Sequence, residues 1–266
     1  MPATYLYCLA RSGALTAIDG PGLDAEHPLD LIRFEDIVAV VSAVSVDDFL
    51  GAPAEARMSD LAWVGPRACR HEEVIERAMR VSPVVPARLA TLFSSRETLA
   101  AWLEAHHDPL SRALDRFAGH DEWAVKGALD RRRAKVHFLD AALARQGGAV
   151  SSSPGKRYFE ERRIQAGIGQ EIEAWLKEAS AGIGKALLDH AVDFRERRIV
   201  SGGTPDDAGA RVLNWAFLVP RSRVDDFRER IRQINAKHAL HGLVLDLSGP
   251  WPPYSFSPSL EPTPAA

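Results

Sequence analysis

A stiff apolar ribbon near the end of the chain, residues 247–256, limits the possible folds more than any other stretch. It contains three prolines and directly follows an alternating run, 241–247, that predicts a β-strand. Proline has no amide hydrogen and pushes the preceding residue towards an extended conformation, so the ribbon can neither continue a central strand nor start a helix. We therefore expect an extended segment packed back on the body of the protein, anchored by Trp251, Tyr254 and Phe256.

A polyproline ligand for another protein is the competing interpretation of this ribbon. Docking tails of that kind usually lie in a polar, disordered context, whereas this ribbon abuts a predicted strand. Packing against the protein's own body is favoured for that reason. On this basis, Trp251→Ala is expected to lower the free energy of unfolding by about 3–5 kcal/mol, as loss of a buried aromatic side chain does.

The first half of the chain alternates β-rich runs with helical patterns, which predicts an α+β domain over 1–130, a mixed α/β sandwich. A helix over 59–80 follows from an apolar stripe that includes His71. The next helix begins at a capping box of Ser94 and Glu97, and Pro109 either kinks it or restarts it. The predicted strands are 4–9, 29–34, 37–44, 83–89 and 122–129, with a tight turn at Glu35-Asp36.

The second half predicts a helical segment and a ferredoxin-like domain over 131–248, with a proline-rich tail over 249–266. Paired glycines inside the long helix predict a bend or break in it. The expected elements are a polar connection over 131–148, a break at 151–155, a helix over 156–194, strands at 197–200 and 212–219, a helix capped by Ser222 with Asp225, and a strand at 243–247.

Charge and composition argue against several classes of partner. The net charge of −3 gives the chain as a whole no field for nucleic acid. The basic runs 131–133 and 195–198 are interpreted as solvated or partner-facing patches rather than RNA sites, and Trp215 with Phe217 as covered core. No run approaches the roughly 20 apolar residues of a membrane span, and no signal peptide is recognisable, so we expect a cytoplasmic protein.

The candidate chemical motifs all favour structural interpretations. The cysteines, Cys8 and Cys69, fit no metal or redox spacing and are expected to be reduced core residues. His71-Glu72-Glu73-Val74-Ile75 begins like a zinc-protease helix, but Ile75 stands where the second histidine is needed, so His71 is expected to be buried and hydrogen-bonded. The adjacent His106 and His107 point to different sides of a helix. We predict no catalytic residue, cofactor or metal, and therefore no enzyme.

Several segments resemble the gas vesicle accessory proteins F and L, which form one family, and they occur in the same order over most of the chain. The ending Leu-Ser-Gly-Pro-Trp-Pro-Pro-Tyr-Ser-Phe looks like the family's hallmark. Leu89-Ala90-Thr91 stands where the family usually has Phe-Gly-Thr. The other matching segments are Tyr5-Leu6-Tyr7, His71-Glu72-Glu73-Val74, Pro83-Val84-Val85-Pro86-Ala87-Arg88, Glu122-Trp123-Ala124-Val125-Lys126, Ser153-Pro154-Gly155 with Tyr158, and Asn214-Trp215-Ala216-Phe217-Leu218-Val219.

The resemblance implies a non-enzymatic accessory or minor structural protein of gas vesicles. It implies a two-domain α+β fold with a ferredoxin-like C-terminal part and a folded-back tail. The implied partners are the main shell protein, which it would guard against aggregation, and other accessory proteins. A ferredoxin-like enzyme or ligand sensor that uses the cleft between domains is the alternative, and RNA binding a third option. The residues that match the family motifs, as structural or partner-contact positions, are His71, Pro86, Arg88, Trp123, Lys126, Gly249, Pro250, Trp251, Pro252, Pro253 and Tyr254.

Overall fold

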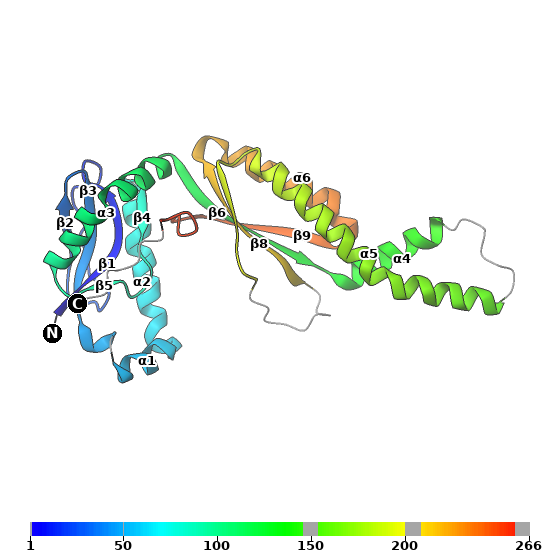
Figure 1. Cartoon of the computed structure of the whole chain (residues 1–266), viewed down its shortest axis with the longest axis horizontal. Helices are drawn as coiled ribbons and strands as arrows, with labels where there is room; N and C mark the ends of the chain where they lie inside the picture. The colour runs from blue at the N-terminus through cyan, green and yellow to red at the C-terminus, as the bar shows by residue number, and fades with distance from the viewer. Residues whose placement is uncertain (1, 50, 146–153, 200–208, 259–266) are drawn as a thin grey trace. The chain divides into compact units, whose positions relative to one another are not determined.

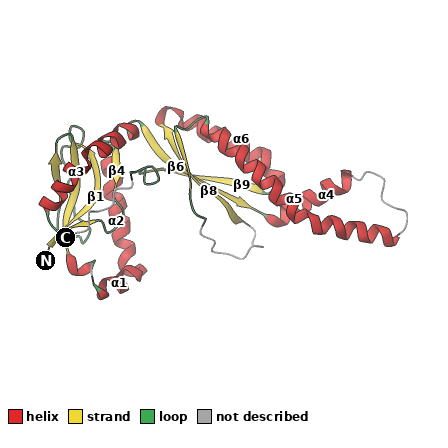
Figure 2. Cartoon of the chain, in the orientation of Figure 1, coloured by secondary structure: helices red, strands yellow, loops and turns green. Residues whose placement is uncertain are grey.

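The structure is a computed structural model that describes residues 2–49, 51–145, 154–199 and 209–258 (Figure 1). It is an α+β protein in which strands and helices form two compact units (Figure 2). Unit 1 consists of Met1–Glu122 and Pro250–Ala266, and unit 2 of Trp123–Gly249. The domain division at residue 130 and the separate tail domain stay predictions.

The sheet of unit 1 is built around β1 (Pro2–Arg11), which is buried along most of its length. The runs that form β1 and β3 (Ile37–Ser45) are apolar on both faces, and both strands are almost entirely buried, as expected of strands covered on two sides. The pairings are antiparallel, in the order β2-β3-β1-β4, with β5 also on β1. The remaining strands are β2 (Leu29–Phe34), β4 (Val84–Pro86) and β5 (Leu92–Phe93).

Three α-helices accompany this sheet: α1 (Ala52–Ser59), α2 (Leu61–Met79) and α3 (Arg96–Phe117). The predicted helix over 59–80 corresponds to α2, which begins where the Asp60 carboxylate accepts a hydrogen bond from the Ala62 N–H. The capping box of α3 is formed by Ser95 and Thr98, so the predicted pair Ser94 and Glu97 is wrong by one position. Pro109 lies inside α3 and does not restart it.

Unit 2 contains a sheet in the order β7-β8-β6-β9, with helices α5 and α6 side by side in Figure 1. Its core joins inward-facing side chains of the sheet, including Trp215 and Phe217, to the apolar stripes of the two helices. Trp215 and Phe217 are 5% and 0% exposed, so their assignment to the core is confirmed. The elements are β6 (His120–Leu129), α4 (Arg131–Arg145), α5 (Pro154–Leu188), β7 (Asp193–Glu196), β8 (Ala210–Pro220), α6 (Val224–His238) and β9 (Leu243–Trp251).

Four expectations for this half are corrected. The predicted polar connection after residue 130 is helix α4, because the Asp130 carboxylate accepts hydrogen bonds from the Arg132 and Arg133 N–H groups at 3.0 Å and caps it. Helix α5 continues through both glycine pairs without a break.

Strand β7 ends at Glu196, before the predicted 197–200. Helix α6 follows a 3-10 turn and has no side-chain cap, so the Ser222 cap is wrong. The predicted break at 151–155 begins outside the described residues.

The outer edge of β9 is covered by a side chain of α6. The Asn235 amide donates to the Leu245 carbonyl at 2.9 Å, and its oxygen accepts from the Leu245 N–H at 2.7 Å. An edge strand otherwise offers such groups to another chain, and Asn235 occupies those of Leu245. Within the described residues, no helix is both long and apolar enough to span a membrane.

Candidate functional site

Two carboxylates of unit 1 hold the C-terminal segment. The Tyr254 hydroxyl donates to Oε1 of Glu72 on α2 at 2.7 Å. One residue later, the Ser255 N–H donates to Oε2 of Glu122 at 2.8 Å, and the Ser255 hydroxyl lies 3.1 Å from Oε1. Glu122 is only 1% exposed, so these contacts satisfy a buried acceptor. We call these four residues, Glu72, Glu122, Tyr254 and Ser255, the tail seat.

The chain reaches the tail seat through buried prolines and then turns. Pro252 and Pro253 are buried. Because proline has no backbone N–H, their burial leaves no donor without a partner. The Tyr254 N–H donates to the Pro252 carbonyl at 2.7 Å, and the Ser257 N–H to the Pro253 carbonyl at 3.0 Å. Phe256 is 6% exposed. The segment is therefore extended only as far as Trp251, where β9 ends, and a turn places the next two aromatic side chains.

A buried chain of hydrogen bonds supports α2 next to Glu72. His71 Nε2 lies 3.1 Å from the Ala87 carbonyl, which can only accept, so Nε2 carries the proton. His71 Nδ1 then accepts from the Tyr5 hydroxyl at 2.8 Å, and the Tyr5 oxygen accepts from the Ala90 N–H at 3.2 Å. Burial lowers the pKa of His71 to about 4, so the imidazole is neutral near pH 7. The expectation of a buried, hydrogen-bonded His71 is confirmed.

Burial also controls protonation at the tail seat. It raises the pKa of the Glu72 carboxyl, an effect that the Tyr254 hydrogen bond opposes and nearby Glu76 reinforces. Burial, followed by the bond to Glu72, raises the pKa of Tyr254 well above its ordinary value. The phenol therefore keeps its proton and acts as the donor. This arrangement joins the C-terminal segment to α2 and β6.

The motif residues fall into three groups. His71, Pro86, Pro252, Pro253 and Tyr254 lie in unit 1, and all but the partly buried Tyr254 are buried. Lys126, Trp123 and Gly249 belong to unit 2. Arg88, Pro250 and Trp251 are exposed.

Two of these residues, Pro86 and Arg88, take part in the structure of unit 1 through their backbone groups. Pro86 in β4 pairs with Cys8 in β1. The Arg88 carbonyl accepts from the Thr91 N–H at 3.1 Å and from the Thr91 hydroxyl at 2.7 Å, which closes a turn. Ala90, inside this turn, has a φ of 65°. A glycine, which stands here in the Phe-Gly-Thr segment of the family that the sequence resembles, would adopt that conformation without strain.

Two sequence expectations about individual side chains are wrong. Trp251 is 41% exposed, so it is not a buried anchor, and Phe256 is the deeply buried ring of the segment. Cys69 is exposed on α2, whereas Cys8 is buried in β1 as expected. Trp123 is 4% exposed in the core of unit 2, with the Arg228 guanidinium 4.9 Å from its ring centroid.

Sequence reasoning missed Glu72, Glu122 and Ser255 as site residues. Each stands within a matching segment, next to a residue that was singled out: Glu72 beside His71, Glu122 beside Trp123, and Ser255 beside Tyr254. Glu122 also directly precedes the apolar run Trp123-Ala124-Val125 of β6. A carboxylate that enters the core with such a run needs a hydrogen-bond partner, which was the available signal.

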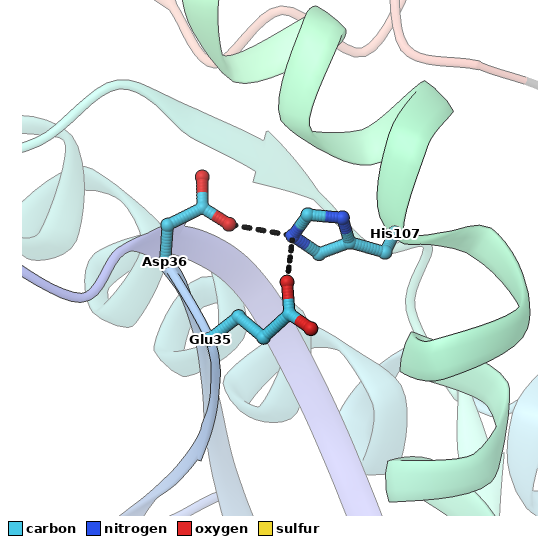
Figure 3. Close-up of side chains that lie close together, drawn as sticks. All are labelled: Glu35, Asp36 and His107. Carbon is cyan, nitrogen blue, oxygen red and sulfur yellow. Dashed lines mark hydrogen bonds and ion pairs between the residues drawn. The ribbon is translucent and has the colours of Figure 1, made fainter.

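One three-residue group among the described residues brings potential metal ligands within 4.8 Å of one another: Glu35, Asp36 and His107 (Figure 3). His107 Nε2 lies 2.5 Å from Asp36 Oδ1 and 3.3 Å from Glu35 Oε2. Asp36 also pairs with the Arg11 guanidinium and accepts from the Ser111 hydroxyl at 3.1 Å. The Arg11 guanidinium and the His107 imidazole already bind this carboxylate, so we interpret the group as a polar network that joins the β2–β3 turn to α3.

Two curated proteins are similar to this chain in sequence over nearly its whole length. The chain is 32% identical to Gas vesicle protein L of Streptomyces sp. (strain CB03234) over 255 residues, covering 95% of this chain and 92% of that protein. It is 27% identical to Gas vesicle protein F of the same strain, covering 96% and 99%.

Two crystal structures share the fold. GvpF from Anabaena sp. PCC7120 gives a TM-score of 0.69 at 18% identity and covers 98% of each chain. GvpF from Microcystis aeruginosa gives a TM-score of 0.66 at 16% identity, covering 96% of this chain and 99% of that one. The family model described as "Gas vesicle synthesis protein GvpL/GvpF" matches residues 3–258. The chain therefore belongs to the GvpL/GvpF family of gas vesicle proteins.

Proposed function

We propose that this protein is a non-enzymatic accessory or minor structural protein that binds the main gas vesicle shell protein, and other accessory proteins, during assembly. The observation that carries this proposal is the family match over residues 3–258. It acts in the cytoplasm, in association with gas vesicles, and without a cofactor.

The physical reason for such a helper lies in the shell protein. A subunit that lines a gas space must expose a strongly apolar face, which would aggregate in water unless it were covered. The described residues offer apolar contact area in both units. Large apolar side chains that are more than half exposed include Leu61 and Val81 in unit 1 and Val136, Leu240 and Val244 in unit 2.

We infer that unit 2 is a ferredoxin-like domain. Its elements follow the order strand, helices, strand, strand, helix, strand, and its sheet order is β7-β8-β6-β9. The first and third strands, β6 and β8, are central in the sheet. Helices α4 and α5 follow β6, and α6 follows β8, as in a split βαβ unit. The tail seat supports unit 1 rather than forming the contact with the shell protein, because its polar groups bind one another.

The proposal is tested by co-expressing this chain, carrying an affinity tag, with the main shell protein of the same organism. The expected result is a complex on the affinity resin and a larger soluble fraction of shell protein than without this chain. An unrelated tagged protein of similar size is the control. A purified chain that carries a cofactor or metal, and leaves the shell protein insoluble, would instead indicate the enzyme or sensor. Salt-sensitive retention of nucleic acid would indicate RNA binding.

A further inference from the structure

Helix α4 exposes apolar side chains on the face opposite its buried side. Ala134 and Phe138 are buried in the core of unit 2. Val136 is 60% exposed and Leu143 is 37% exposed, and these two residues are seven positions apart, which places them on the same face of the helix. Leu139, between them, is partly exposed. We call Val136, Leu139 and Leu143 the outer stripe of α4.

The helix is held firmly enough to present this stripe. Asp130 caps its first turn, and Phe138 packs edge-to-face on Trp175 of α5, with ring centroids 5.6 Å apart. Ion pairs at the surface join both ends of α4 to the same helix: Arg131 to Glu173 at 2.7 Å and Arg145 to Glu171 at 2.6 Å. The outer stripe therefore belongs to a helix that is packed on unit 2.

The charges around the stripe indicate what would cover it. Helix α4 contains five basic residues and a single acidic one, Asp140, although the whole chain has a net charge of −3. Arg132, Arg133 and Lys135 are exposed near the outer stripe. An apolar stripe with a basic border is complementary to an amphipathic helix whose apolar face is bordered by carboxylates.

We propose that the outer stripe of α4 is the docking surface for an amphipathic, acid-bordered helix of the gas vesicle shell protein, a proposal that rests on the function proposed above. Apolar contacts with Val136, Leu139 and Leu143 provide the affinity, and the basic border sets the orientation of the bound helix. Nucleic acid fits this surface less well, because exposed aliphatic side chains gain nothing from phosphates.

The test uses the full-length tagged chain in the co-expression experiment, in four forms. The first is the unchanged chain, and the second carries Val136→Asp with Leu143→Asp. The third is a matched control, Leu188→Asp with Val192→Asp, which places the same changes on exposed positions of unit 2 away from α4. The fourth is Arg132→Glu, which alters the border and leaves the apolar residues in place. Circular dichroism and the melting temperature show whether each form is folded.

We expect the α4 double variant to recover at least roughly tenfold less shell protein than the unchanged chain, as loss of a central apolar contact does. The matched control should recover the unchanged amount, and Arg132→Glu should give an intermediate loss. If the α4 double variant fails to fold, the Arg132→Glu form decides the outcome.

Equal recovery by all four forms would overturn this docking surface and leave the proposed function standing. Absence of shell protein from the unchanged chain would overturn both. Loss of bound nucleic acid in Arg132→Glu, with shell recovery unchanged, would assign the surface to nucleic acid and overturn the proposal.

Discussion

The Tyr254 hydroxyl and the Glu72 carboxylate form a 2.7 Å hydrogen bond between residues 182 positions apart. This bond joins the C-terminal segment to α2, and Glu72 follows directly after His71, whose ring is hydrogen-bonded to Tyr5 in β1. The final part of the chain is therefore connected, through two adjacent helical residues, to the central strand of unit 1.

Tyr254→Phe should weaken the attachment of the C-terminal segment. The substitution keeps the ring and removes the donor, leaving a partly buried carboxylate with one bond fewer, at a cost of about 1–3 kcal/mol. Hydrogen exchange followed by mass spectrometry should show faster exchange in peptides that cover residues 252–258. In a double-mutant cycle with Glu72→Gln, the two changes should be non-additive. Strict additivity would show that the two side chains do not interact.

Phe256→Ala and Trp251→Ala should differ in their effect on stability. Phe256 is 6% exposed, so its truncation should cost about 3–5 kcal/mol, as in a packed core. Trp251 is 41% exposed, and its truncation should cost less than about 1.5 kcal/mol. Urea denaturation of both variants, followed by far-ultraviolet circular dichroism, provides the comparison. A larger loss for Trp251→Ala would contradict the burial of these two rings.

Ala90→Gly should stabilise unit 1. Ala90 has a φ of 65°, a left-handed conformation that costs a residue with a Cβ about 1–2 kcal/mol. Glycine has more freedom in the unfolded chain, so the net gain should be roughly 0.5–1 kcal/mol. Ala118→Gly is the control, since Ala118 has a φ of −58° and no such strain to relieve. A rise in melting temperature is expected for the first variant alone, and equal shifts would rule out relief of strain.

Two histidines of unit 1 should give opposite dependences of stability on pH. Burial lowers the folded-state pKa of His71 to about 4. Between about pH 4 and pH 6.5 the unfolded state therefore binds more protons than the folded state. The free energy of unfolding falls by about 3 kcal/mol as the pH drops through this window. The Asp36 hydrogen bond raises the pKa of His107. Protonated His107 therefore stabilises the folded state fully below about pH 6.5, its pKa in the unfolded chain. This stabilisation is lost as the pH rises through the raised pKa of the folded state.

The two titrations can be separated by NMR of the imidazole protons from pH 4 to 8. His107→Gln should remove the loss of stability on the alkaline side and leave the acid side unchanged. A His71 resonance that titrates near pH 6.5 would show that the ring is hydrated and charged, in conflict with its contacts to Tyr5 and Ala87.

Much of the secondary structure could be predicted locally, because it depends on patterns that a few neighbouring residues define. The strands beginning at Leu29 and Ile37 and the turn at Glu35-Asp36 follow directly from alternation and turn chemistry. Helix α4 was missed because Ala134 and Phe138 face the core while Val136 and Leu143 face outward. Apolar residues on opposite faces give no single stripe, so the usual helical signal is lost.

The tail seat could be predicted only in part. The prolines indicate a constrained segment, but composition cannot show which of its three rings points inward. Trp251 lies at the end of β9, whereas Tyr254 and Phe256 follow a turn, and this difference depends on the position at which the strand stops. The partners Glu72 and Glu122 come from distant parts of the chain, and their pairing depends on the tertiary fold.

The order of segments in unit 1 has a consequence for synthesis on the ribosome. Its first 122 residues leave the exit tunnel long before Pro250, and the whole of unit 2 is translated in between. The part of unit 1 that is made first must therefore wait for its closing segment until the whole of unit 2 has been synthesised. A chain that ended at Gly249 would leave the ribosome with unit 2 translated in full and unit 1 unfinished.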